Sequence, residues 1–286
     1  MIPGRLFTFG CSFTKYHYPT WADLLGKEWE YFENWGSIGS GNSYIFHSVI
    51  ECCQRNNLGP NDTVIMLWSG LTRMDFYQHR SWRTFRDLSL NNYSDDIPQH
   101  CPDGYEINSF SLMDAIHNTL ENKKIKFHSL TWVDYDRETR VAKFFKDTLD
   151  QVKFVDFELN KQAYTSLPRY YIQKKFSELW NVFAGPDWPE FDDFISNTYT
   201  AKSPEIELEL EDFKKKILLA DQQTAIRLKS EIDHHPLPTQ HLASLQKHLP
   251  EYKISDSTIQ WAHDCEKNLL NNQPLDFKIC LLDNRL

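Results

Sequence analysis

The chain has 286 residues, of which 41% are hydrophobic and 25% are charged, and its formal net charge is -9. This length is enough to bury one large core, and the composition is typical of a soluble globular protein. The acidic balance argues against a nucleic-acid-binding protein, which would need a basic face. No stretch is apolar and long enough for a signal peptide or a membrane span, so we expect a cytoplasmic protein without nucleic-acid or membrane partners.

The first predicted element is a buried strand over residues 6–9, which ends at a glycine. Gly10 allows the backbone to turn sharply, and Ser12 follows directly after the turn. In a parallel sheet, functional side chains gather beyond the carboxyl ends of the strands. The pattern therefore indicates a nucleophilic serine, although a plain β-turn with a capping serine fits it equally well.

A helix is predicted over residues 20–26, and a second strand over residues 29–34. The glycine-rich residues 36–42 then open a helix over residues 43–55. The loop does not have the glycine spacing of a dinucleotide-binding site, and no acidic residue follows at the distance such a site requires. Gly39 could instead direct a backbone N–H at a reacting carbonyl. Asn42 could add a side-chain donor, but such a residue is more often a helix N-cap.

Residues 63–68 form the clearest buried strand, and polar residues follow it. Arg73 and Asp75 could simply pair at the surface. They also follow the carboxyl end of a strand, at the same end of the sheet as Ser12. Arg73 could therefore donate to an oxyanion or to a substrate carboxylate.

The remaining chain is predicted to contain a long excursion, two more strands and several helices. Residues 77–108 are polar and predict a long excursion over the sheet, before a helix over 109–122 and strands over 126–133 and 151–157. The segment over residues 158–232 is too long for a plain connection and predicts a helical insertion. This insertion could cap the active-site end of the sheet, or serve a structural or oligomerising role. Two more helices are expected at the end of the chain, over residues 238–248 and 255–270.

Asp233 and His235, followed by Pro236, place an acid and a base near each other late in the chain. Together with Ser12 and Gly39, they resemble the sequence blocks of the SGNH/GDSL hydrolase superfamily. The resemblance implies a single domain over residues 1–286. Its expected fold is a three-layer α/β/α sandwich with a parallel sheet of about five strands, similar to flavodoxin.

This resemblance also implies a catalytic triad of Ser12, Asp233 and His235, with the backbone N–H groups of Ser12 and Gly39 as the oxyanion hole. Three features depart from the family pattern, and the first is Cys11, which stands where the family has aspartate. Asp233 precedes His235 by two residues instead of three, and the third block lacks the asparagine that the family uses as an oxyanion donor. The predicted function is a serine esterase or O-acyltransferase acting on an acyl ester, with a small acyl group on a carbohydrate as the preferred substrate. The alternative is a catalytically degenerate protein that binds a glycan or a partner.

A metal site is an alternative, because Asp233, His234, His235 and His241 are all ligand types. The chain supplies no matching set of cysteines and no H-E-x-x-H motif, so we expect neither a metal nor a cofactor, and His241 is predicted to lie on the helix surface or behind the site. The cysteines show no metal-type spacing. Except for Cys11, they are predicted to be small buried hydrophobic residues.

Overall fold

The computed structural model describes residues 1–157, apart from 17, 72, 79–80 and 86–101, and residues 235–270, 275 and 277. The predicted insertion over 158–232 lies outside the described residues, as do Asp233 and His234. Within the described ranges, no helix is long and apolar enough to cross a membrane.

A five-stranded sheet forms the centre of the described chain, in the order β2-β1-β3-β6-β7. All four neighbouring pairs are parallel. The strands are β1 (Ile2–Gly10), β2 (Trp29–Asn34), β3 (Asp62–Trp68), β6 (Lys126–Thr131) and β7 (Val152–Phe154). The carboxyl ends of these strands therefore meet at one edge, as the sequence predicted. The last strand is shorter than predicted.

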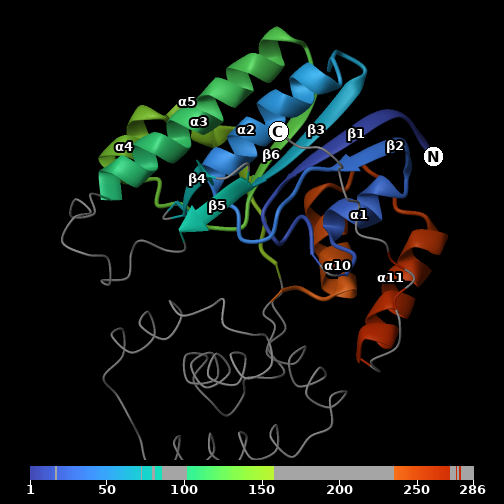
Figure 1. Ribbon diagram of the computed structural model, residues 1–286. Helices are drawn as coiled ribbons and strands as arrows, with labels where there is room; N and C mark the ends of the chain where they lie inside the picture. Colours follow the sequence, from blue (N-terminus) through green and yellow to red (C-terminus); the bar gives the residue numbers. More distant parts are fainter. Residues whose placement is uncertain are drawn as a thin grey trace, which may run out of the picture.

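Helices cover both faces of this sheet (Figure 1). One face carries α2 (Asn42–Arg55), α3 (Pro102–Asn122), α4 (Arg140–Phe144) and α5 (Lys146–Asp150). The other carries α1 (Trp21–Gly26), α10 (Pro238–His248) and α11 (Asp256–Leu270). The predicted three-layer α/β/α fold is confirmed.

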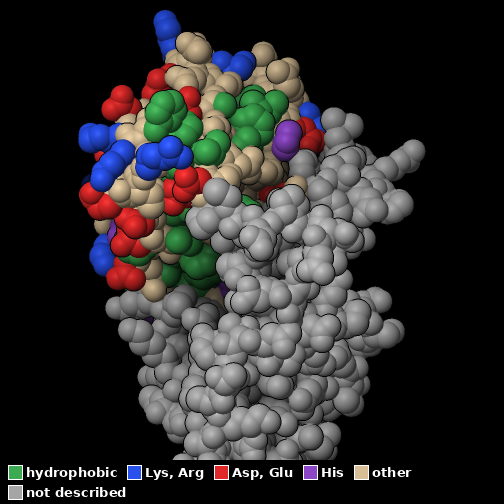
Figure 2. All heavy atoms as spheres, turned by 90° about the vertical axis from the view of Figure 1, so that its left-hand side faces the viewer, with side chains coloured by type: hydrophobic (Ala, Val, Ile, Leu, Met, Phe, Trp, Pro, Cys, Tyr) green, Lys and Arg blue, Asp and Glu red, His purple; other side chains and the backbone are tan. Residues whose placement is uncertain are grey.

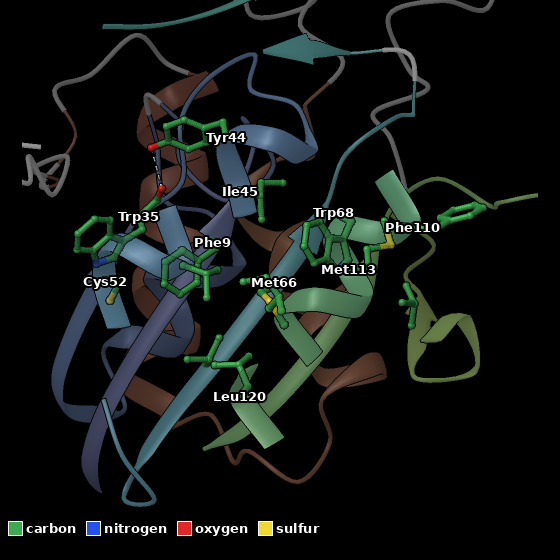
Figure 3. Close-up of a cluster of buried hydrophobic side chains, with 14 of the residues drawn as sticks. Phe9, Trp35, Tyr44, Ile45, Cys52, Met66, Trp68, Phe110, Met113 and Leu120 are labelled. Atoms are coloured by element: carbon green, nitrogen blue, oxygen red, sulfur yellow. Dashed lines mark hydrogen bonds between the residues drawn. The ribbon is translucent and has the colours of Figure 1, made fainter. Parts of the chain in front are cut away.

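Alternation along β1 divides the core into two clusters. Phe7 and Phe9 belong to the cluster under α2 and α3, whereas Leu6 belongs to the cluster under α1 and α10. This alternation follows from the period of two in a strand, and it makes both faces of β1 apolar because helices cover both. Figure 3 shows the first cluster, where Phe9, Met66 and Trp68 from the sheet meet Ile45 of α2 and helix α3.

The excursion predicted over residues 77–108 is wrong at both of its ends. A two-stranded antiparallel hairpin forms from β4 (Met74–Gln78) and β5 (Ser81–Phe85), and α3 begins at Pro102, seven residues earlier than expected. Proline is favoured in the first turn of a helix. Contacts with the start of α4 also stabilise the start of α3. Arg140 donates a hydrogen bond of 3.1 Å to the Asp103 carboxylate, and Thr139 Oγ1 donates one of 2.7 Å to the Glu106 carboxylate.

Figure 2 shows the side of the molecule that lies at the left in Figure 1, where acidic and basic side chains are interspersed with smaller hydrophobic patches. Ion pairs lie near α4 and α5, including Lys143 with Glu138 at 3.0 Å. Both partners are largely exposed, so such pairs contribute little to stability.

Candidate active site at the carboxyl edge of the sheet

Ser12 lies in a tight turn directly after β1 and is 5% exposed. The carbonyl of Cys11 accepts from the N–H groups of Thr14 at 2.9 Å and Lys15 at 3.1 Å, which closes the turn. A Cβ on Gly10 would lie 2.1 Å from Thr14 Oγ1, so only glycine fits where the strand enters the turn. We call residues 11–15 the Ser12 turn.

The imidazole of His235 packs against residues of this same region. Its ring stacks on Tyr16 with a centroid distance of 4.0 Å and lies 5.3 Å from the ring of Phe13. Tyr18 Oη donates a hydrogen bond of 3.3 Å to the His235 carbonyl. The chain thus brings the predicted base, more than 200 residues away in sequence, to the Ser12 turn.

Further aromatic side chains surround Phe13. Its ring stacks on Trp132, just beyond β6, at 4.8 Å and an interplanar angle of 7°. Phe157, which follows β7, lies 5.3 Å from it. The aromatic group therefore combines segments that follow three strands of the sheet, next to the Ser12 turn.

Gly39 lies in the loop that joins β2 to α2, which we call the Gly39 loop (residues 35–41). Trp35 N–H donates to the Thr8 carbonyl at 2.8 Å and Ser37 N–H to the Gly10 carbonyl at 3.0 Å, so the loop runs beside the end of β1. Gly39 has a φ of +80°, a left-handed conformation that favours glycine. Among the described residues, no acceptor is found for the N–H of Ser12 or Gly39.

Asn42 is the first residue of α2, and Gly41 is the N-cap in its place. The Asn42 side chain is 1% exposed and joins the end of β3 to α3. Its Nδ2 donates to the Ser69 carbonyl at 3.2 Å and to Ser109 Oγ at 3.1 Å, and its Oδ1 accepts from Ser69 N–H at 2.8 Å. Both amide protons are used in these contacts.

Arg73 and Asp75 hold the start of α2 from outside. Arg73 donates to the Ser40 carbonyl at 3.1 Å, and its guanidinium lies 5.8 Å from the ring centroid of Trp132. The Asp75 carboxylate accepts from Gly41 N–H and Tyr44 N–H, each at 2.8 Å. A Cβ on Gly41 would lie 2.8 Å from the Arg73 carbonyl oxygen, so these segments touch closely. Asp75 thereby acts as a distant N-cap, a role that depends on tertiary contacts and could not be predicted from local patterns.

The sequence interpretation also missed two buried polar residues next to the site. Asn34, the last residue of β2, is 0% exposed, and Asp23 of α1 is 8% exposed. Asn34 Nδ2 donates to Asp23 Oδ1 at 3.1 Å. Burial raises the pKa of Asp23, although hydrogen bonds from Thr20 and Asn34 oppose this effect. A polar residue at the end of a strand, two residues before Gly36, was the available signal.

His241 does not lie on the helix surface as one reading predicted. It is fully buried in α10, with its ring 5.5 Å from that of Phe157. Within the described part of the chain, no cluster of histidine, cysteine, aspartate and glutamate could hold a metal ion. Cys52, Cys53 and Cys265 are buried free thiols, as predicted, and Cys11 is buried as well.

Comparisons with solved structures give distant matches, among them the following two. No protein-family model matches the sequence, and no curated protein matches it. Protein YxiM of Bacillus subtilis matches with a TM-score of 0.33 and 10% identity, over 54% of this chain and 44% of its own length. A member of the lipolytic G-D-S-L family from Veillonella parvula matches with a TM-score of 0.29 and 14% identity, over 54% of this chain and 77% of its own. The chain thus spans less than half the length of the first of these structures.

The sheet itself defines the class of fold. Numbered along the sheet-forming strands alone, the order is 2-1-3-4-5, with helices on both faces. This is a three-layer, SGNH-like α/β fold, and it carries Ser12 directly after its first strand.

Proposed function

We propose that this chain is a divergent SGNH/GDSL-type serine hydrolase that cleaves or transfers an acyl ester. The observation that carries the proposal is the packing of His235 on Tyr16 and Phe13, beside the turn that presents Ser12. A serine hydroxyl is a weak nucleophile at neutral pH and needs a base within reach. The arrangement gathers a serine and a histidine at the edge where parallel sheets hold their active sites.

In the proposed mechanism, Ser12 Oγ attacks the ester carbonyl while His235 takes the hydroxyl proton. Collapse of the tetrahedral intermediate breaks the bond to the alcohol, which receives the proton from His235 and leaves. The acyl-enzyme on Ser12 then passes its acyl group to water or to a second alcohol, with His235 again taking and returning a proton. Asp233 is proposed to orient the imidazole and to stabilise its charged form.

The oxyanion is proposed to be stabilised by the N–H groups of Ser12 and Gly39. Support comes from their position, because among the described residues neither group has an acceptor and their loops lie side by side. One such donor typically lowers the barrier by about 3 kcal/mol. Asn42 and Arg73 are proposed to support the site rather than to donate to the substrate, because their hydrogen bonds hold Ser69, Ser109 and Ser40 in place.

The proposed substrate is the ester of a small acyl group, which is transferred to Ser12, with a carbohydrate as the leaving alcohol. Aromatic rings stack well on sugar faces, and Tyr16 and Trp132 bring such rings to the Ser12 turn. Comparison of aryl acetate with aryl octanoate tests the acyl group, and comparison of acetylated oligosaccharides with acetate esters of simple alcohols tests the carbohydrate. Faster turnover of the acetate and of the acetylated sugar is expected, whereas a preference for octanoate would contradict the proposed substrate.

Covalent labelling with a fluorophosphonate probe tests the reaction class. We expect the wild-type protein to be labelled, Ser12→Ala and His235→Ala to lose labelling, and Ser37→Ala to keep it as a matched control in the Gly39 loop. A well-folded wild-type protein that is not labelled would contradict the hydrolase and favour a binding protein for a glycan or a partner.

A further inference from the structure

Asn34 connects three segments of the site through one buried side chain. Its Nδ2 donates to the Thr14 carbonyl at 2.8 Å and to Asp23 Oδ1 at 3.1 Å, and its Oδ1 accepts from Gly36 N–H at 3.0 Å. Thr14 belongs to the Ser12 turn and Gly36 to the Gly39 loop. Removal of this fully buried amide would leave its hydrogen-bond partners unsatisfied, because they are also shielded from water.

The two loops also touch directly where Asn34 joins them. A Cβ on Gly36 would lie 2.9 Å from Lys15 Cβ and 3.1 Å from the Lys15 backbone nitrogen. The Ser12 turn and the Gly39 loop are therefore in van der Waals contact, with the Asn34 amide fastened to both. Since the N–H groups of Ser12 and Gly39 lie on these loops, their separation depends on this junction.

The Thr14 carbonyl has a second donor that leads to the same acid. Thr20 Oγ1 lies 2.6 Å from the Thr14 carbonyl and 2.9 Å from Asp23 Oδ2, while Thr20 N–H donates to Asp23 Oδ2 at 2.9 Å. The threonine hydroxyl has one proton, and the carbonyl can only accept. That proton is therefore shared between the Thr14 carbonyl and Asp23 Oδ2, so Thr20 ties both acceptors together.

We propose that Asn34 is a positioning residue that fixes the Ser12 turn and the Gly39 loop relative to each other, with Asp23 and Thr20 as its buried support. The inference deepens the proposed hydrolase function and rests on it for its effect on reactivity. Asn34 does not contact the reacting atoms in this account. It sets the geometry of the groups that do.

Asn34→Ala tests the inference with two measurements, amide hydrogen exchange and the rate constant of fluorophosphonate labelling. We expect the amides of Thr14, Lys15 and Gly36 to exchange at least about tenfold faster, and labelling to slow about 100-fold, as is typical of small misplacements in active sites. Asn56→Ala is the matched control. Asn56 also bonds a residue of β2, Glu33, at 3.1 Å, but it lies at the other end of α2.

The control separates positioning from general loss of stability. A labelling rate that falls equally in Asn34→Ala and Asn56→Ala would overturn the inference, as would wild-type exchange at Gly36 and Thr14 in folded Asn34→Ala. If the wild-type protein is not labelled at all, the proposed function fails. The exchange rates then still decide whether Asn34 fastens the two loops.

Thr20→Val decides the question if Asn34→Ala does not fold. Valine keeps the shape of threonine but removes its bond to the Thr14 carbonyl. We expect faster exchange at Thr14 and Lys15, unchanged exchange at Gly36, and labelling slowed about tenfold, with recovery in Thr20→Ser. Unchanged exchange in the Ser12 turn of Thr20→Val would overturn the inference.

Discussion

Two neighbouring regions at the carboxyl edge of the sheet use their polar groups differently. At the ends of β1 and β2, side chains such as Asn34 fasten the loops from behind, and the backbone N–H groups of Ser12 and Gly39 have no acceptor among the described residues. At the end of β3, Asn42, Arg73 and Asp75 direct their polar atoms at neighbouring segments of the protein. Under the proposed function, the first region carries the reacting groups and the second supports them.

Asn42→Ala should produce the largest effect on stability. Its three hydrogen bonds join β3, α2 and α3 in a buried site, and their loss should lower the free energy of unfolding by about 3 kcal/mol. Chemical denaturation measures this change. Labelling of the folded variant should slow less than about tenfold, because the amide supports the site from behind. A hundredfold slower reaction would instead make Asn42 an oxyanion donor, as the sequence first suggested.

Gly41→Ala and Gly39→Ala form a matched pair that separates the two regions. A Cβ on Gly41 would collide with Arg73 and Asp75, so we expect a loss of about 2–3 kcal/mol in stability. A Cβ on Gly39 meets nothing within 4 Å, and its cost of about 1–2 kcal/mol arises from the left-handed backbone. Thermal unfolding measures both losses, and Gly41→Ala should be the less stable variant. Labelling should slow more in Gly39→Ala, and the reverse order of reactivity would contradict the proposed oxyanion hole.

The pH dependence of stability tests a group far from the site. His117 is buried, and its Nε2 lies 2.8 Å from Ser129 Oγ, which accepts from Trp68 Nε1–H. The Ser129 proton is thus free to be donated to His117, which requires an uncharged imidazole. Burial lowers the pKa of His117 from 6.5 to about 4.

Below pH 6.5 the unfolded chain gains a proton that folded His117 does not. Stability is therefore lost as the pH falls from 6.5 towards 4, by about 2 kcal/mol between pH 6.5 and 4.5. Denaturation of the wild type and of His117→Asn across this range isolates the contribution. It should be missing from the variant, and equal pH profiles would refute it. Asp23 acts in the opposite sense, because its raised pKa makes its contribution fall as the pH rises.

Arg73→Ala should have the smallest effect. It removes one hydrogen bond to the Ser40 carbonyl and the contact with the Trp132 ring, together worth about 1 kcal/mol. Labelling and thermal unfolding of the variant should both stay close to those of the wild type. A loss of turnover without a loss of stability would show that Arg73 contacts the substrate, which was the other prediction from the sequence.

The sequence predicted the parts of this fold that depend on local patterns. The apolar run before Gly10 and the continuous run of β3 indicated buried parallel strands, and these placed Ser12 at the correct edge of the sheet. The start of α3 was missed because Pro102 and Asp103 resemble a turn until the contacts of α4 are known. The burial of His241 was missed for a similar reason, since it depends on Phe157.

The support behind the site could not be predicted in the same way. Asn34 and Asp23 are separated by 11 residues, and their role depends on how β2 and α1 pack together. Asparagine is common where a strand ends and a turn begins. The residue type alone therefore does not distinguish a buried junction from an exposed turn. The hydrogen bonds that give Asn34 its importance exist only in the folded chain.

The most direct test of the central claim is the site at which a fluorophosphonate reacts in the wild-type protein, mapped by mass spectrometry of its peptides. The account predicts one adduct, on Ser12, in the turn between β1 and α1. An adduct on any other serine, with Ser12 unmodified, would contradict the claim that this edge of the sheet holds the reactive nucleophile.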